Sequence, residues 1–119
     1  MPDFRVHAFN EPHGVRVIEV TGEARVEISQ RLQDAVLASL TGAAAPPVVL
    51  DLAGLEHLDS ASTSALIRLR EAVVEQRGGT LVLCGLRPVV YRVLDVTGLA
   101  PRFTILDDRE KALAHLTER

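Results

Sequence analysis

The stretch that decides the fold class is Val48–Leu52, which reads Val-Val-Leu-Asp-Leu. This brief, almost continuous apolar run is typical of a strand buried on both faces of a parallel sheet. Thr80–Cys84 is a second run of the same kind, and between the two a helical pattern of apolar side chains begins at about Ala61 and stops at Gly78-Gly79. A strand, a helix and a strand in this order form a parallel crossover unit. The sequence therefore predicts an α/β fold.

The segment that precedes this unit predicts a hairpin and a helix. Phe4–Phe9 and Val15–Thr21 read as two short strands around the turn Glu11–Gly14, and Gly22 is expected to end the second strand. A helix should follow, because apolar or small side chains recur there at spacings of three to four residues. That face comprises Ile28, Leu32, Ala35, Val36, Ser39 and Leu40, and Gly42 is expected to cap the helix.

The C-terminal part adds a helix from Pro88, a strand at Phe103–Leu106 and a last helix that Asp107 and Glu110 would open as a capping box. The predicted order is β-β-α-β-α-β-α-β-α. This describes a layered α/β domain with a mixed, mostly parallel sheet, an N-terminal antiparallel hairpin and about four helices. A length of 119 residues predicts one domain over residues 1–119.

Composition argues against several classes of function. The net charge of -3 and the aromatic content of 3% do not favour nucleic-acid binding, which relies on basic faces and stacking side chains. The single cysteine, Cys84, excludes an internal disulfide and a CxxC site, and we expect it to be a small buried hydrophobe. No apolar run approaches the ~20 residues that cross a bilayer. We therefore expect a cytoplasmic protein without direct membrane insertion.

The richest candidate site follows the strand that begins at Val48. Ligands of open α/β sheets meet the carboxyl ends of strands, and the connection Ala53–Ser60 leads there into the next helix. Four hydroxyl side chains and one carboxylate gather at this helix start, in the segment Leu58–Ser64. One interpretation is that Asp59 or Ser60 simply caps the helix. The other is that the free N–H groups and the helix dipole provide a seat for an anion, including a phosphate on a serine.

The chain resembles the STAS domain of bacterial anti-sigma-factor antagonists. The resemblance is carried, in order, by Val49–Leu52, Leu58–Ser60, Gly79–Gly85, Val93–Leu99 and Ala112-Leu113. It implies a protein that binds an anti-sigma factor, itself a serine kinase, and thereby releases a sigma factor. It also implies that phosphorylation of one serine at this helix start blocks binding, and that a serine phosphatase restores it.

The chain departs from the family pattern at two places. The family reads Asp-Ser-Ser-Gly with the second serine as phospho-acceptor, whereas here Ser60 takes the first serine position, Ala61 the acceptor position and Ser62 the glycine position. The family's Gly-Glu-Leu-Asp is Gly-Glu-Ala-Arg here, ending at Arg25. Three outcomes stay open: Ser60 or Ser62 is the acceptor, the domain binds its partner constitutively, or it serves as a STAS subunit of a lipid-trafficking transporter or a signalling scaffold.

An enzyme is the rival interpretation, because His57, Asp59 and Ser60 could suggest a nucleophile with its base. Triad members usually come from separate elements, and the chain has no GxSxG elbow, so we expect no catalytic residues. The four histidines lack the short spacing of a zinc site, and no glycine-rich phosphate loop is present, so we expect neither metal nor cofactor. The predicted partner-binding surface consists of His57, Asp59, Ser60, Ala61, Ser62, Thr63 and Ser64.

Overall fold

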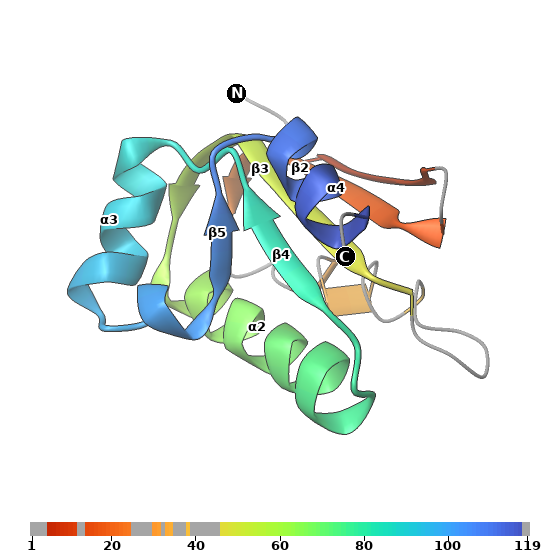
Figure 1. Cartoon of the computed structure of the whole chain (residues 1–119). Helices are drawn as coiled ribbons and strands as arrows, with labels where there is room; N and C mark the ends of the chain where they lie inside the picture. Colours follow the sequence, from red (N-terminus) through yellow and green to blue (C-terminus); the bar gives the residue numbers. More distant parts are fainter. Residues whose placement is uncertain are drawn as a thin grey trace.

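The computed structural model describes residues 5–11, 14–24, 30–31, 33–34, 38 and 46–117. Its five strands form one sheet in the order β1-β2-β3-β4-β5 (Figure 1). The pairing of β1 with β2 is antiparallel, and the other three pairings are parallel. The mixed, mostly parallel sheet with an N-terminal hairpin is therefore confirmed. The strands are β1 (Arg5–Asn10), β2 (Arg16–Ala24), β3 (Val48–Leu58), β4 (Leu81–Cys84) and β5 (Thr104–Leu106).

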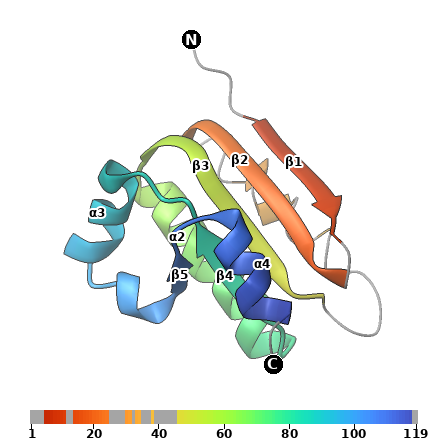
Figure 2. The same ribbon diagram turned by 45° about the horizontal axis from the view of Figure 1, so that its top comes forward.

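Helices cover both faces of the sheet. The helix α2 (Ser60–Arg70) continues into a π-helical turn (Glu71–Gln76), and α3 (Pro88–Val96) is followed by a 3₁₀ turn (Ala100–Arg102). The last helix is α4 (Arg109–Thr117). Helices α2 and α3 pack on one face, whereas α4 lies on the other, as Figure 2 shows. No helix in the described part of the chain is long and apolar enough to span a bilayer.

The first predicted helix falls largely on residues that the structure does not describe. The described positions 30, 31, 33, 34 and 38 are helical. The residues that carried the prediction lie outside the described ones, namely Ile28, Leu32, Ala35, Val36, Ser39, Leu40 and the expected cap Gly42.

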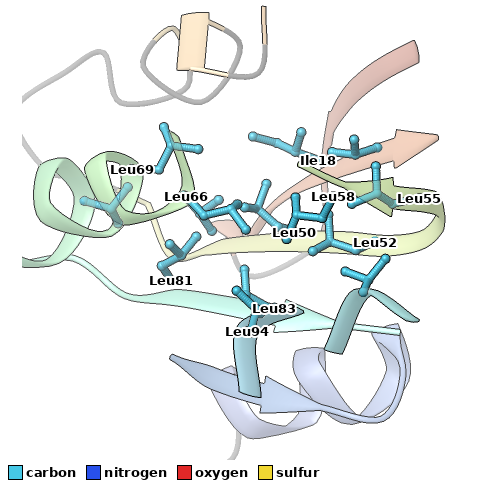
Figure 3. Close-up of a cluster of buried hydrophobic side chains, with 14 of the residues drawn as sticks. Ile18, Leu50, Leu52, Leu55, Leu58, Leu66, Leu69, Leu81, Leu83 and Leu94 are labelled. Carbon is cyan, nitrogen blue, oxygen red and sulfur yellow. The ribbon is translucent and has the colours of Figure 1, made fainter. Parts of the chain in front are cut away.

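The continuous apolar character of β3 and β4 follows from the two helical layers. Side chains alternate between the faces of a strand. Leu50 and Leu52 accordingly join the large cluster under α2 and α3, which Figure 3 shows, whereas Val49 joins the smaller cluster under α4. In β4, Leu83 belongs to the first cluster and Val82 to the second. Because both faces are covered there, neither the run Val48–Leu52 nor β4 has a solvent side that would need polar residues.

The predicted connection Ala53–Ser60 is wrong over most of its length, because β3 runs on to Leu58. Its second half pairs with an extension of β2 beyond Gly22, where the strand was expected to end. Gly22 instead lies inside β2 with a φ of 97°, next to a shift in register. Gly54 permits this pairing, since a Cβ atom there would lie 2.5 Å from Cγ2 of Thr21. Pairing with a distant strand thus overrides the local turn signals.

The capping box predicted from Asp107 and Glu110 does not form, because the residue that caps α4 lies one position further on. The Oδ1 atom of Asp108, not of Asp107, accepts a hydrogen bond of 2.8 Å from the backbone N–H of Lys111. Asp107 instead forms an ion pair of 2.9 Å with Nζ of Lys111. A carboxylate can cap a helix only from the position just before its first turn, and that position is occupied by Asp108.

Candidate functional site: the corner between β3 and α2

The corner is the short passage from the end of β3 into the first turn of α2. Asp59 is the N-cap residue, with extended backbone angles and with Oδ1 accepting a hydrogen bond of 2.8 Å from the N–H of Ser62. The hydroxyl of Thr63 donates to the carbonyl of Asp59 at 2.8 Å, and the N–H of Thr63 donates to the same oxygen at 2.9 Å. The capping interpretation of Asp59 is confirmed. These bonds fix the corner's backbone and side chains in one arrangement.

The hydroxyl groups of the corner separate into two sets. Ser60 and Ser64 are exposed, whereas the side chains of Ser62 and Thr63 are buried, with 0% and 6% of their surface exposed. Ser60 and Ser64 are four residues apart and therefore share one face of the helix. Ala61 between them is partly buried and carries no hydroxyl. A partner approaching from solvent can reach the first set only.

The burial of Ser62 argues against its predicted roles as phospho-acceptor and as a partner contact, because a kinase or a partner must reach the side chain. The same burial argues against direct contact by Thr63, whose hydroxyl already serves the backbone. A signal for this was present in the sequence. Ser62, Leu66, Leu69 and Val73 follow one another at spacings of four, three and four residues, so Ser62 continues the apolar stripe of the helix.

His57 lies next to the corner but inside β3 rather than in a loop. Its side chain is exposed, and its backbone is in register with Glu23 of β2. Leu58, which follows it, is only 8% exposed and packs in the large core cluster, so it anchors the end of the strand. Arg25, the cation that departs from the family pattern, lies outside the described residues. Within the described ranges, no group of three His, Cys, Asp or Glu side chains is arranged to hold a metal ion.

A second polar cluster, which the sequence analysis did not foresee, crosses the opposite face of the sheet. His7, Glu19, Asp51 and Cys84 are aligned by strand register across β1, β2, β3 and β4. Arg109, the first residue of α4, donates a hydrogen bond of 2.9 Å from Nε to Asp51 and forms ion pairs through Nη2 with Asp51 and Glu19. An aspartate inside the apolar run Val48–Leu52 signalled such a cluster, because a buried carboxylate needs partners.

The cluster shifts the ionisation of two of its members. Partial burial opposes the charge of Arg109, but hydrogen bonds to Glu19 and Asp51 outweigh it and raise the pKa of Arg109 above its ordinary value. Burial, and then the negative charge of Asp51, raise the pKa of the Cys84 thiol to about 12. A thiol with this pKa stays protonated at neutral pH, which agrees with the prediction of a small buried hydrophobe. The cluster therefore joins α4 to the sheet and offers no reactive nucleophile.

Comparison with known proteins places this geometry in a family. The model of the STAS domain family matches residues 8–112. An anti-sigma F factor antagonist of Paenibacillus polymyxa is 27% identical over 103 residues, which cover 87% of each chain. The crystal structure of an anti-sigma factor antagonist from Mycobacterium paratuberculosis superposes with a TM-score of 0.85, at 22% identity, covering 98% of this chain and 96% of that one.

A further solved structure is also similar. It is a sulfate transporter family protein from Wolinella succinogenes, with a TM-score of 0.76 and 25% identity over 87% of this chain and 85% of that one. The match of the family model over most of the chain agrees with the sheet order and the two helical layers described above. On these grounds, the chain belongs to the STAS domain family.

Proposed function

We propose that this chain is a cytoplasmic anti-sigma factor antagonist, a single STAS domain over residues 1–119 that binds an anti-sigma factor and so frees a sigma factor. The similarity to an anti-sigma F factor antagonist over 87% of each chain supports this class of protein. The observation that carries the proposal is the exposed Ser60 at the first turn of α2, held in place by the N-cap Asp59. The chain acts by binding, with no catalytic group of its own.

The docking surface consists of the exposed side chains around the corner. His57, Ser60 and Ser64 face solvent there, and Arg68 continues the exposed face of α2 one turn further on. Asp59, Ser62 and Thr63 shape this surface from below, because their hydrogen bonds and burial hold the first turn. Exposed polar side chains at an interface affect the specificity and the rate of association more than they affect the affinity.

Ser60 is the phospho-acceptor in this proposal, and the anti-sigma factor is the serine kinase that modifies it. Ala61 has no hydroxyl, and the hydroxyl of Ser62 is buried, so Ser60 is the exposed serine nearest the family's acceptor position. A phosphate adds about -1.5 to -2 charges at pH 7. The positive end of α2 tolerates this charge in the free domain, whereas a docked partner would have to desolvate it. Phosphorylation therefore weakens the complex, and a serine phosphatase restores it.

The test is to incubate the full chain with the anti-sigma factor kinase of the same cell and ATP, and to locate the phosphate by mass spectrometry. We expect one phosphate on Ser60 and none in the Ser60→Ala variant. The matched control is Thr104→Ala, which removes an exposed hydroxyl on β5, outside the docking surface, and should leave the phosphate in place. In a binding assay, Ser60→Glu should weaken the complex by about tenfold or more, equivalent to ~1.4 kcal/mol. Phosphate on another residue, or undiminished binding by Ser60→Glu, would contradict the switch.

The second candidate is a STAS subunit of a transporter or scaffold without phospho-regulation. The similarity to the sulfate transporter family protein of Wolinella succinogenes favours it. The two functions differ in the partner that copurifies with the tagged full chain. A permease–ATPase complex would support the transporter subunit, whereas a kinase that phosphorylates Ser60 would support the antagonist.

A further inference from the structure

A small hollow lies where β4 and β5 begin, beside the end of α2 and its π-helical turn. In Figure 1 this is the end of the two strands away from the arrowheads. Its volume of 270 Å³ lies just below the range of about 300–1,000 Å³ that is usual for drug-sized ligands, so it suits a small molecule. The corner at Ser60 contributes no residue to it.

The charge of the hollow is of one sign. Its charged lining residues in the described part of the chain are two arginines, Arg70 and Arg102, and the remaining ones are apolar or neutral. The whole chain carries a net charge of -3, so a hollow with cations alone runs against the overall charge. Guanidinium groups bind oxyanions through paired N–H donors. The lining therefore selects for an oxyanion.

The π-helical turn positions Arg70 at this hollow. Nη1 of Arg70 forms an ion pair of 2.8 Å with Glu75, five residues further on. Residues five apart in an α-helix point about 140° away from each other, whereas the i→i+5 winding of a π-helix brings them to one side. Nε of Arg70 also donates a hydrogen bond of 2.6 Å to the carbonyl of Arg102. Two contacts thus fix this guanidinium, and π-helical turns are frequent at functional sites.

Arg102 supplies a charge that the fold does not compensate. Its side chain is exposed and forms no hydrogen bond or ion pair with the other described residues. The guanidinium of Arg102 lies within one side-chain length of its own carbonyl, to which Arg70 donates. The two cations therefore belong to one small region, where an anion that contacts both relieves their mutual repulsion.

Two nearby features disfavour an anion, and the fold reduces the effect of both. The carboxylate of Glu75 is paired with Arg70 and does not line the hollow. The negative end of the helix dipole also lies here. The last carbonyls of the turn, on Val73 and Val74, however, already accept hydrogen bonds from the N–H groups of Gly79 and Gly78.

We propose that this hollow binds a phosphate group through Arg70 and Arg102. A phosphate monoester carries about -1.5 to -2 charges at pH 7, which suits two arginines better than the single charge of a carboxylate. The apolar lining residues Val74, Leu81 and Phe103 offer a surface to the remainder of a phosphorylated small molecule. The site is separate from the corner and does not depend on the function proposed for it.

The test is an NMR titration of the ¹⁵N-labelled full chain at constant ionic strength and pH 7, with inorganic phosphate and with phenyl phosphate as probes. We expect saturable shifts of the amide signals of residues 79–81 and 102–104, and far smaller ones with acetate. Arg102→Gln should weaken phosphate binding by about tenfold, as loss of a charge-assisted hydrogen bond does. Stronger binding of phenyl phosphate would identify a phosphorylated small molecule as the ligand, and equal binding free phosphate.

The matched control is Arg92→Gln, which removes an exposed arginine of α3 that does not line the hollow. It should leave phosphate binding within about twofold, the ordinary effect of a remote surface substitution. Arg70→Lys keeps the charge without the forked donors and should weaken binding too. The spectrum of each variant shows whether it is folded. The proposal is wrong if phosphate causes no saturable shift, if acetate causes equal shifts, or if Arg92→Gln weakens binding as much as Arg102→Gln.

Discussion

At the scale of single residues, Ser62 has a hydroxyl group that the fold buries without a hydrogen-bond partner in the described part of the chain. An unsatisfied polar group costs about 1–3 kcal/mol when it is buried. We therefore expect Ser62→Ala to leave the free energy of unfolding unchanged or to raise it by up to ~1 kcal/mol. Urea denaturation measures this, with the exposed Ser60→Ala as the matched control. A clear loss of stability in Ser62→Ala would show that the hydroxyl has a partner after all.

At Gly54, the addition of a single carbon atom is expected to lower the stability of the fold. In Gly54→Ala, the new methyl group would lie 2.5 Å from Cγ2 of Thr21, closer than two carbon atoms approach without displacement. We expect a loss of about 1–3 kcal/mol in the free energy of unfolding. Thr21→Ser in the same chain removes Cγ2 and should recover part of this loss. If the contact between Gly54→Ala and Thr21 did not matter, the effects of the two substitutions on the free energy of unfolding would simply add, and this explanation would be wrong.

At the scale of elements, α4 is joined to the sheet through one side chain. Arg109 pairs with Asp51 and Glu19, and its guanidinium carbon lies 5.3 Å from the centre of the Phe9 ring. It thus links the first turn of α4 to β1, β2 and β3. The side chains in the two ion pairs are partly exposed: the exposed fraction is 32% for Arg109, 12% for Asp51 and 36% for Glu19. Solvent therefore screens part of the interaction.

Arg109→Met should lower the free energy of unfolding by about 1–3 kcal/mol, because it leaves two neighbouring carboxylates without their cation. Arg109→Lys should lose less, since it keeps the charge but not the forked geometry of the guanidinium. Arg92→Met on α3 is the control for loss of an exposed arginine. Hydrogen exchange should increase in α4 more than in α3. Equal exchange in both helices would mean that Arg109 does not hold α4.

At the scale of the whole molecule, Cys84 reports on global unfolding. The thiol is fully buried, and its pKa is raised to about 12, so it should react with a thiol reagent at pH 8 only when the chain unfolds. We expect the rate of labelling in water to be far slower than in urea. Rapid labelling under native conditions would show that the layer formed by α4 opens locally.

The raised pKa of Cys84 also predicts a dependence of stability on pH. Below the ordinary thiol pKa, both the folded and the unfolded chain keep the proton, so the contribution of Cys84 is constant. At higher pH the unfolded chain loses the proton first, and the free energy of unfolding falls until the pH passes about 12, the pKa in the folded state. Cys84→Ala should show a shallower fall over this range in urea denaturation. If the free energy of unfolding fell equally steeply with pH in Cys84→Ala and in the unchanged chain, the raised pKa of Cys84 would not be the cause.

Local sequence patterns were sufficient to predict most of the secondary-structure elements and part of the corner. The apolar runs of β3 and β4, the helical spacing of α3 and a cap at Asp59 or Ser60 are encoded by residues adjacent in the chain; the structure confirms the elements and makes Asp59 the cap. The same local signals were misleading for Ala53–Leu58, where glycine and polar residues indicate a loop. Pairing with β2 makes that segment a strand, because main-chain hydrogen bonds to a distant strand are worth more than a weak local preference.

The sequence by itself determined the α/β class, the mostly parallel sheet and the polar helix start at which the corner lies, since these depend on the periodicity and chemistry of neighbouring residues. The spacing of α2 indicates that Ser62 continues the apolar stripe, but only the tertiary structure decided that this stripe docks on the sheet with Ser62 buried and Ser60 exposed, and that Arg109 meets Glu19 and Asp51. Successive residues of a helix point about 100° apart, so the way α2 docks on the sheet decides which hydroxyl faces solvent. Arg109 and Glu19 lie 90 positions apart in the chain, and only the packing of α4 on the sheet brings them together.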